Sequence, residues 1–372
     1  MRGSSGITSV GMSEHVRIES SGRFTAPALP DHWHVACLSS ELRNRPLGRT
    51  VLGIPMVLFR DRSGLAVALV DRCPHRNVEL SAGRCVDGGL ECRYHGWRFD
   101  ASGRCVEVPG LEETVADRPV RRVDRFPVGE RDGMVWVVPS GVEPQAGPPH
   151  LDGVGEPGYR TIHLRMDVPG PYVAAVENAL DVTHTSFLHR GLFRTGKRRK
   201  PVQVTIVHGP DRVEARFEGE AVPSGLLGRA LAPQGGSIEH TDRFVVPALA
   251  QVEYRLRSGA ADGDDRHIVL NAFYTPVTDD SCVLHAAAAY RLPVPVAVAR
   301  AALVPLARIV LRQDVDILAN QRANVTRFGG ERFVNTTIDV LGPPIVRLLR
   351  RHERGEASAE PQAADDVVTM LI

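Results

Sequence analysis

Two short pairs of cysteine and histidine constrain this chain more than any other feature. Cys73-Pro74-His75 is followed, after sixteen intervening residues, by Cys92-Arg93-Tyr94-His95. Each pair offers one thiolate and one imidazole, which suits an iron-sulfur cluster whose one iron takes two sulfurs and whose other iron takes two nitrogens. A Cys2His2 zinc site is the alternative, because zinc accepts the same donors, although zinc sites more often pair C-x-x-C with two spaced histidines. Cys85, between the pairs, is expected to be a packed thiol.

These pairs, together with Tyr94 and the Gly96-Trp97 pair, resemble the Rieske domain of ring-hydroxylating oxygenases over about residues 30–140. The resemblance implies that the [2Fe-2S] cluster is held by Cys73, His75, Cys92 and His95. Respiratory-chain Rieske proteins add two cysteines joined as a disulfide, at places where this chain has Val78 and Tyr94. The respiratory type is therefore disfavoured.

A second group of potential metal ligands follows the pattern D-x-x-H-x(4)-H, with Asp181, His184 and His189. Asp181 and His184 are expected to share one helical face through their i, i+3 spacing. His189 would lie about 140° round the same helix, so the helix must end or distort before it. Two imidazoles and one distant carboxylate form the facial triad that leaves positions open on Fe(II). The alternative is that the histidines are satisfied core residues.

The third iron ligand is expected far down the chain, in Gln313-Asp314-Val315-Asp316, where two aspartates compete. On a helix Asp314 shares its face with Ile317 and Leu318, whereas Asp316 lies on a more polar stripe. We expect Asp314 to point inward, and a buried carboxylate needs a cation beside it. The alternative role for Asp314 is that of a helix N-cap. Glu177 and Asn178 are either groups that support the site or surface and capping residues.

The second group again looks like the Rieske oxygenase family. The resemblance implies that Asp181 orients His184 and links it to a cluster histidine of a neighbouring subunit, His95 before His75, in a homotrimer. It implies mononuclear Fe(II), with electrons from NAD(P)H that arrive through a separate ferredoxin and/or flavin reductase.

The layout is closest to homotrimeric members of the vanillate demethylase, ketosteroid hydroxylase and pheophorbide oxygenase types. Monooxygenation of a hydrophobic ring-containing small molecule is therefore the first expectation, by hydroxylation or oxidative demethylation, with desaturation and oxidative cyclisation open. A non-catalytic Rieske electron-transfer protein is the alternative.

The pattern of short strands, turns and helical segments predicts an α+β organisation. Residues 1–22 are expected to be a flexible leader, 23–140 an all-β Rieske domain, and 141–158 a linker rich in proline and glycine. Residues 159–351 are expected to form a helix-grip-like catalytic domain, in which an antiparallel sheet packs on a long helix. Residues 352–372 are expected to be a mobile tail.

Composition excludes some partners and favours a compartment. The formal net charge of +1 provides no global field for nucleic acid or an anionic membrane. The six cysteines lack the density of a disulfide-stapled secreted domain, which favours a reducing, cytoplasmic setting. The apolar stretch 292–311 is interrupted by prolines and arginines, so we expect a buried helix and no membrane span. The basic run 194–200 is either a solvated loop or a docking patch for an acidic electron carrier.

Overall fold

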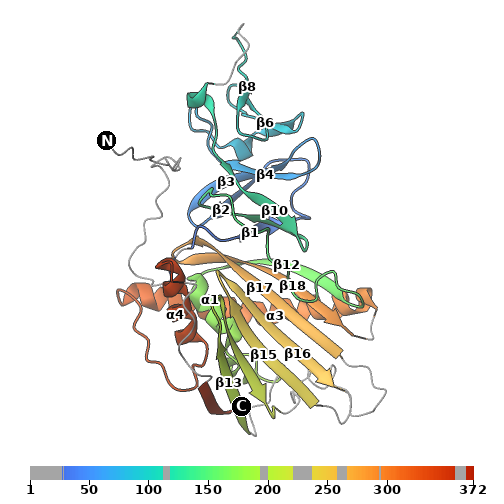
Figure 1. Cartoon of the computed structure of the whole chain (residues 1–372), viewed down its shortest axis with the longest axis vertical. Coiled ribbons are helices and arrows are strands. Elements are labelled where there is room, and N and C mark those ends of the chain that lie inside the picture. The colour runs from blue at the N-terminus through green and yellow to red at the C-terminus, as the bar shows by residue number, and fades with distance from the viewer. Residues whose placement is uncertain are drawn as a thin grey trace, which may run out of the picture.

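The computed structural model describes residue 27 and residues 29–111, 118–192, 200–220, 237–257, 266–292, 295–356 and 366–372. The expected leader, residues 1–22, lies outside these residues, as does all of the basic run except Lys200. Figure 1 shows two parts stacked along the long axis of the molecule, a smaller part of short strands and a larger part with one broad sheet and helices. The α+β fold class predicted from the sequence is confirmed.

The N-terminal part consists of three small antiparallel sheets with the orders β1-β11-β10, β2-β3-β4-β9 and β5-β6-β7-β8. Alternate residues of its strand β3 (Ile54–Arg60) enter two different cores, Met56 and Leu58 one of them, Val57 and Phe59 the other. Because successive side chains of a strand point to opposite faces, β3 is buried on both sides and joins the two cores. The other elements are β1 (His34–Leu38), β2 (Leu47–Val51), β4 (Ala66–Val70), η1 (Leu80–Ala82), β5 (Arg84–Val86), β6 (Gly89–Glu91), β7 (Arg98–Phe99), β8 (Cys105–Glu107), η2 (Pro119–Arg121), β9 (Arg125–Phe126), β10 (Val128–Arg131) and β11 (Met134–Val137).

The C-terminal part is built on one antiparallel sheet with the order β12-β18-β17-β16-β15-β14-β13-β19. Of these strands, β12 comes first in the chain but pairs with β18, near the end of the sequence order, and forms one edge of the sheet. The strands are β12 (Arg160–Val168), β13 (Pro201–His208), β14 (Arg212–Glu218), β15 (Ser237–Val245), β16 (Leu249–Arg257), β17 (Arg266–Thr278), β18 (Ser281–Arg291) and β19 (Asp366–Leu371).

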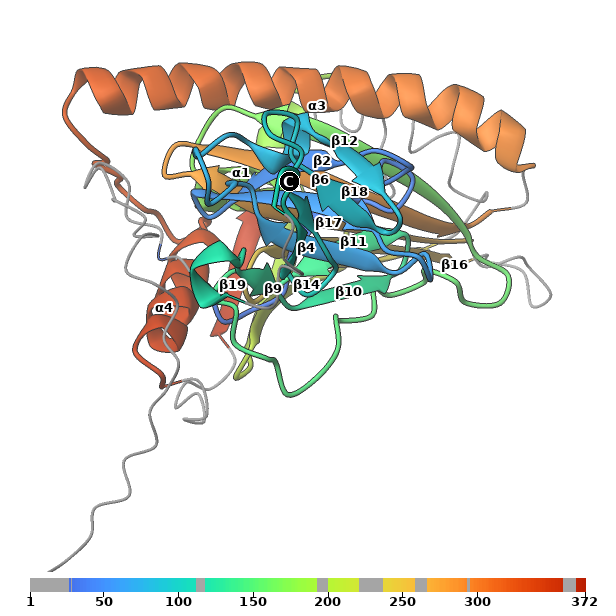
Figure 2. The same cartoon turned by 90° about the horizontal axis from the view of Figure 1, so that it is seen from above.

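Helices lie on one face of this sheet, which we call the inner face. Helix α1 (Tyr172–Leu180) contacts β15, β16 and β17, and the long helix α3 (Val296–Arg327) runs along β12 (Figure 2). Helix α4 (Gly342–Glu353) packs near β14, and a short 3-10 turn, η3 (Thr183–Ser186), follows α1. The N-terminal part covers the opposite, outer face, where Trp136 meets Phe273 edge-on at 5.2 Å and Thr275 donates a 2.6 Å hydrogen bond to the carbonyl of Val35.

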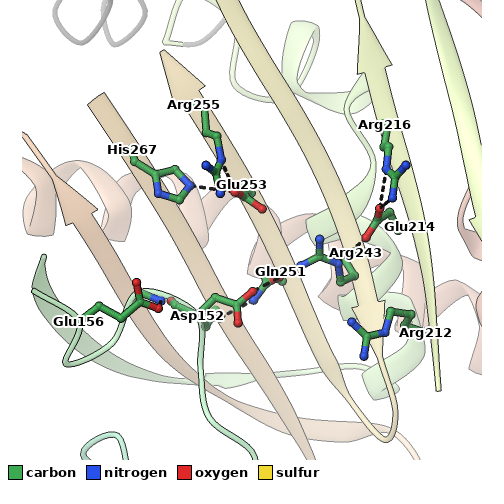
Figure 3. Close-up of polar contacts among 12 residues, drawn as sticks. Asp152, Glu156, Arg212, Glu214, Arg216, Arg243, Gln251, Glu253, Arg255 and His267 are labelled. Carbon is green, nitrogen blue, oxygen red and sulfur yellow. Dashed lines mark hydrogen bonds and ion pairs between the residues drawn. The ribbon is translucent and has the colours of Figure 1, made fainter. Parts of the chain in front are cut away.

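The segment between the two parts also packs on the outer face. Its Leu151 and Val154 are buried in the main core. The carbonyl of Asp152 accepts a hydrogen bond of 3.1 Å from Asn271, whose side-chain oxygen accepts one of 2.8 Å from Gln251. The polar chain continues across the sheet through Arg243 and Glu214, as Figure 3 shows. These hydrogen bonds thus tie the segment to the outer face of the large sheet, and each of the side chains in the chain has a partner.

Two expectations about the C-terminal half are wrong. Residues 366–371 of the expected mobile tail form strand β19, which pairs with β13, and α4 continues past residue 351 to Glu353. The physical reason is that Val368 and Met370 alternate onto the inner face and join the core. The expected buried helix in the stretch 292–311 is instead largely exposed, because α3 packs only a narrow stripe against β12 and α1 and leaves 57% of Val298 and 54% of Ile309 accessible. Within the described part of the chain no helix is long and apolar enough to span a bilayer.

Candidate metal centres

The two cysteine and histidine pairs lie on matching loops at the end of the N-terminal part that faces away from the large sheet (Figure 1). In each loop the amide four residues beyond the cysteine donates to the cysteine carbonyl, Asn77 to Cys73 at 2.9 Å and Gly96 to Cys92 at 3.0 Å. Asn77 and Gly96 both have positive φ, 59° and 72°, the region that asparagine and glycine tolerate best. The local sequence thus turns both loops in the same way.

The thiols lie inside the loops and the imidazoles lie at their surface. Cys73 and Cys92 are buried, His75 is half-buried and His95 is exposed, with the two imidazole centroids 4.5 Å apart. Burial and the neighbouring Cys92 together raise the pKa of the Cys73 thiol to about 11, although the amide of His75 opposes the shift. A bound metal must therefore displace a proton from a thiol that is otherwise neutral at pH 7.

The spacing of these four donors separates a cluster from a single ion. A zinc ion with bonds of about 2.0–2.3 Å needs all its donors within about 4 Å of one another. In the described part of the chain, no three of these four residues have donor atoms that all lie within 4.8 Å of one another. Two sulfurs on one side and two nitrogens on the other, too far apart for one ion, fit a two-iron cluster.

A second, compact donor group lies between α1 and α3. The Nε2 atoms of His184 and His189 are 3.1 Å apart, and Oδ1 of Asp314 lies 3.6 Å and 3.0 Å from them. Metal bonds of about 2.1 Å that meet at right angles place their donors about 3.0 Å apart, so the three atoms fit one face of an octahedral ion. Asp314 Oδ1 is buried without a hydrogen-bond partner, which is the state expected of a metal-binding oxygen.

The chain reaches this geometry differently from the expectation for Asp181 and His184. Helix α1 ends at Leu180, and Asp181 has an extended backbone with φ −89° and ψ 106°, so the two residues do not share a helical face. The Asp181 carboxylate instead accepts hydrogen bonds from the amides of Thr183, at 2.7 Å, and His184, at 3.3 Å, and thereby begins the 3-10 turn. An aspartate that can bond the following amides competes with helix continuation at this point. The prediction that the helix ends before His189 agrees with this break.

A residue that sequence reasoning did not assign completes the site. Oε1 of Gln313 lies 2.7 Å from Nδ1 of His189 and accepts a hydrogen bond from its N–H, which leaves Nε2 of that imidazole to bind a cation. Burial lowers the pKa of His184, although Asp181 and Asp314 oppose the shift, and this favours the neutral form that a metal requires. The sequence does not indicate this role for Gln313, because its partner His189 lies 124 residues earlier in the chain.

The structure separates the two competing aspartates and places Asp181 in a cavity. Asp314 is 14% exposed and points at the histidines, whereas Asp316 is exposed on the outside of α3. Asp181 lies 3.7 Å from Nδ1 of His184 and lines a cavity of about 650 Å³ between α1, α3 and the segment before α4. Glu177 and Asn178 line the same cavity. Burial raises the pKa of Glu177, and the negative charges of Asp339, Asp181 and Glu331 raise it further. The cavity is therefore acidic.

Comparison with known proteins agrees with this arrangement. Residues 32–127 match the Rieske [2Fe-2S] domain, and residues 168–356, just over half of the chain, match the vanillate O-demethylase oxygenase C-terminal domain. The oxygenase component of dicamba O-demethylase from Stenotrophomonas maltophilia is 41% identical over 204 residues, which are 54% of this chain and 59% of that protein. A putative iron-sulfur subunit of a toluene-4-sulfonate monooxygenase system from Comamonas testosteroni is 42% identical over 42% of this chain and 45% of that protein. These alignments thus span about half of each relative.

A longer alignment and a solved structure extend the similarity over most of the chain. The vanillate O-demethylase oxygenase subunit of a Pseudomonas species is 26% identical over 90% of this chain and 96% of that protein. The crystal structure of dicamba monooxygenase bound to dicamba has a TM-score of 0.74 and 27% identity, and covers 90% of this chain and all of that one. The chain carries a Rieske [2Fe-2S] cluster and a mononuclear iron as its cofactors. It belongs to the Rieske non-haem iron oxygenase family, with the catalytic domain of the vanillate O-demethylase type.

Proposed function

We propose that this chain is the terminal oxygenase component of a Rieske system and that it uses O2 to oxidise a hydrophobic, ring-containing small molecule. The observation that carries the proposal is the donor group of His184, His189 and Asp314, gathered within 4.8 Å on one side of an ion position. Three donors on one face leave the opposite positions open for O2 and water, as the chemistry requires. A non-catalytic Rieske carrier has no use for this group.

In this proposal each metal centre has its own ligands on the chain. Cys73, His75, Cys92 and His95 hold the cluster, and His184, His189 and Asp314 hold the iron. When bound, the iron activates O2 with electrons relayed by the cluster. Gln313 fixes the tautomer of His189, and Asp181 orients His184. We assign residues 23–140 to the Rieske domain, 141–158 to the linker and 159–351 to the catalytic domain, now with β19 added to its sheet.

We further propose that electrons reach the iron from the cluster of a second copy in a homotrimer. Asp181 is 38% exposed inside the acidic cavity, where it could accept a hydrogen bond from a neighbour's exposed His95. The loops that carry the cluster ligands also present Arg76 and Arg93 to solvent, so their charge is complementary to that of the cavity. Apolar side chains near the cavity, Phe333 and Val334, are 54% and 92% exposed in one chain and would be covered by a neighbour.

The external partners follow from the same reaction. A separate ferredoxin and/or flavin reductase would supply electrons from NAD(P)H, in the cytoplasm, where thiols stay reduced. Hydroxylation or oxidative demethylation is the favoured outcome, because the similar proteins named above are O-demethylases and monooxygenases. Desaturation and oxidative cyclisation would use the same iron ligands.

Replacement of Asp314 by alanine tests the proposal, with Asp316→Ala as the matched control on the same helix. Iron analysis of the parent should give about three irons per chain, two of them in the cluster. Asp314→Ala should fall to about two with an unchanged cluster absorbance, and should lose substrate oxidation in a product screen with a surrogate reductase. Asp316→Ala should keep both. Equal iron and product in Asp314→Ala would refute the assigned ligand set.

A further inference from the structure

The first half of helix α3 presents an apolar row to the surroundings. Val298 and Ile309 are 57% and 54% exposed, and Ala302 and Pro305 between them are exposed too. Their spacing of i, i+4, i+7 and i+11 places these four residues, which we call the outer row, along one side of the helix. Figure 2 shows α3 at one margin of the molecule, with no other described element outside it. The outer row is therefore a straight apolar ridge about 16 Å long, at ~1.5 Å per residue.

Three arginines of the same half of α3 extend into solvent. Arg300, Arg308 and Arg312 are exposed, and in the described part of the chain none of their side chains forms an ion pair or a hydrogen bond. Arg243 on the sheet, by contrast, donates a 2.6 Å hydrogen bond to Glu214. Because Arg308 and Arg312 are four residues apart, they lie on one side of the helix, next to the outer row.

The sequence around these arginines contains no negative charge. Residues 281–313 include four arginines and no aspartate or glutamate. The next acidic residues of α3 are Asp314, which points at the histidines, and Asp316, one turn beyond Arg312. The net charge of +1 gives the whole chain no general attraction to an anionic surface. The first half of α3 is thus a local cationic patch on a nearly neutral protein.

The composition of this surface favours lipid over a protein partner. Apolar side chains on one side of a helix, with arginines beside them, are typical of helices that lie in the interface of an anionic bilayer. Aromatic residues, which anchor many protein interfaces, do not occur anywhere in the sequence of α3. A straight ridge at the margin of the molecule can contact a flat surface along its whole length.

We propose that the first half of α3 binds the surface of an anionic phospholipid bilayer. The outer row then lies at the boundary of the acyl chains, and Arg308 and Arg312 bind lipid phosphates. This lipid contact does not depend on the proposed function. One consequence does rest on it: a hydrophobic substrate partitions into bilayers, so the bound enzyme would meet its substrate where that substrate is concentrated.

The test measures co-sedimentation of the full chain, loaded with both metal centres, with vesicles at low salt. The vesicles contain phosphatidylcholine alone or equal parts of phosphatidylcholine and phosphatidylglycerol. The parent should bind the anionic vesicles and not the neutral ones, and added salt should weaken the binding. The double variant Arg308→Gln with Arg312→Gln should bind about 25-fold more weakly, or about fivefold for each arginine.

The matched control is Arg347→Gln with Arg350→Gln, because these two arginines are exposed on α4 and their replacement removes the same charge. It should bind as the parent does. Equal affinities of the two double variants would overturn the inference. The basic run 194–200 is present in all of these proteins, so any contribution from it is common to them.

The apolar half of the contact has its own readouts. Val298→Ser with Ile309→Ser should weaken binding to the anionic vesicles roughly tenfold and leave its salt dependence unchanged. In Ile309→Trp, brominated lipid should quench more tryptophan fluorescence than in the parent, whose three tryptophans all lie outside α3. No additional quenching would mean that the outer row stays out of the bilayer and would overturn the inference.

A second copy of the chain is the rival occupant of the outer row. In that case the parent would fail to bind anionic vesicles, and Ile309→Asp would lower the oligomeric mass in sedimentation equilibrium; this result would overturn the inference. Under the lipid proposal Ile309→Asp keeps the parent mass and loses vesicle binding. All of these measurements are made without reductase or substrate, so the lipid contact and the proposed oxidation stand or fall separately.

Discussion

A buried histidine between two carboxylates should make the stability of this protein fall at alkaline pH. His240 is fully buried, with Nδ1 2.7 Å from Glu220 Oε2 and Nε2 2.9 Å from Asp242 Oδ1. Its ring stacks between Phe217 and Tyr254, with centroid distances of 4.4 and 4.3 Å. Burial lowers the pKa of His240, but Asp242 and Glu220 outweigh it and raise the pKa to about 9. Both ring nitrogens therefore carry protons at pH 7.

The sign and size of the effect follow from proton linkage. The folded pKa lies above the unfolded value of 6.5, so the folded state binds the proton more tightly. The stabilisation that His240 gives to the folded state is complete below pH 6.5 and is lost as the pH rises through 9. A shift of about 2.5 units corresponds to roughly 3 kcal/mol, of which roughly 2.5 kcal/mol remains at pH 7 and almost none at pH 10.

The assay compares thermal unfolding at pH 7 and pH 10 in the parent and in a neutral triple variant, Glu220→Gln with His240→Gln and Asp242→Asn. All other titrating groups are common to both proteins, so the difference between the two pH effects isolates the cluster. The parent should lose roughly 2.5 kcal/mol more than the variant over this range. Parallel losses in the two proteins would refute the assigned protonation state of His240.

Three further outcomes are expected from other sites. Gln313→Leu should weaken iron binding about 10–100-fold in a competition with a chelator, because His189 loses the acceptor that fixes its tautomer; unchanged affinity would contradict that role. Asp181→Asn should keep both metal centres loaded and lower turnover about 10–100-fold, whereas loss of iron would make Asp181 a ligand. Burial lowers the pKa of His34 to about 4 and of His285 to about 3, below the unfolded value, so the unfolded state binds protons more readily as the pH falls below 6.5. Each histidine should therefore lower the free energy of unfolding by about 2 kcal/mol between pH 7 and pH 5. A thermal midpoint of His285→Gln that falls over this range as far as that of the parent would contradict this expectation.

The metal-binding motifs could be read from the sequence because their geometry is local. Cys73 and His75 lie on one tight turn, Cys92 and His95 on another, and short loops with positive φ need only a few residues to form. The choice of Asp314 over Asp316 also came from local reasoning, since the periodicity of a helix determines which side faces the core. The structure places Asp314 beside the histidines and Asp316 in solvent.

Other features depend on contacts between distant segments and could not be predicted. The i, i+3 spacing of Asp181 and His184 predicted one helix through both residues. The Asp181 carboxylate instead accepts hydrogen bonds from the following amides, and α1 ends before it. The last residues were expected to be mobile because they form a polar chain terminus. Strand β19 forms only against β13, more than 150 residues earlier in the chain. The exposure of α3 likewise depends on how much of the sheet the other helices leave uncovered.

By itself the sequence predicted the side chains that would bind each metal, because donor type and close spacing are properties of a few consecutive residues. Only the tertiary structure decided how Asp314 and Gln313 meet the two histidines, and how Glu220 and Asp242 enclose His240. These arrangements are fixed by packing and strand register between segments far apart in the chain, and no local pattern specifies such distances.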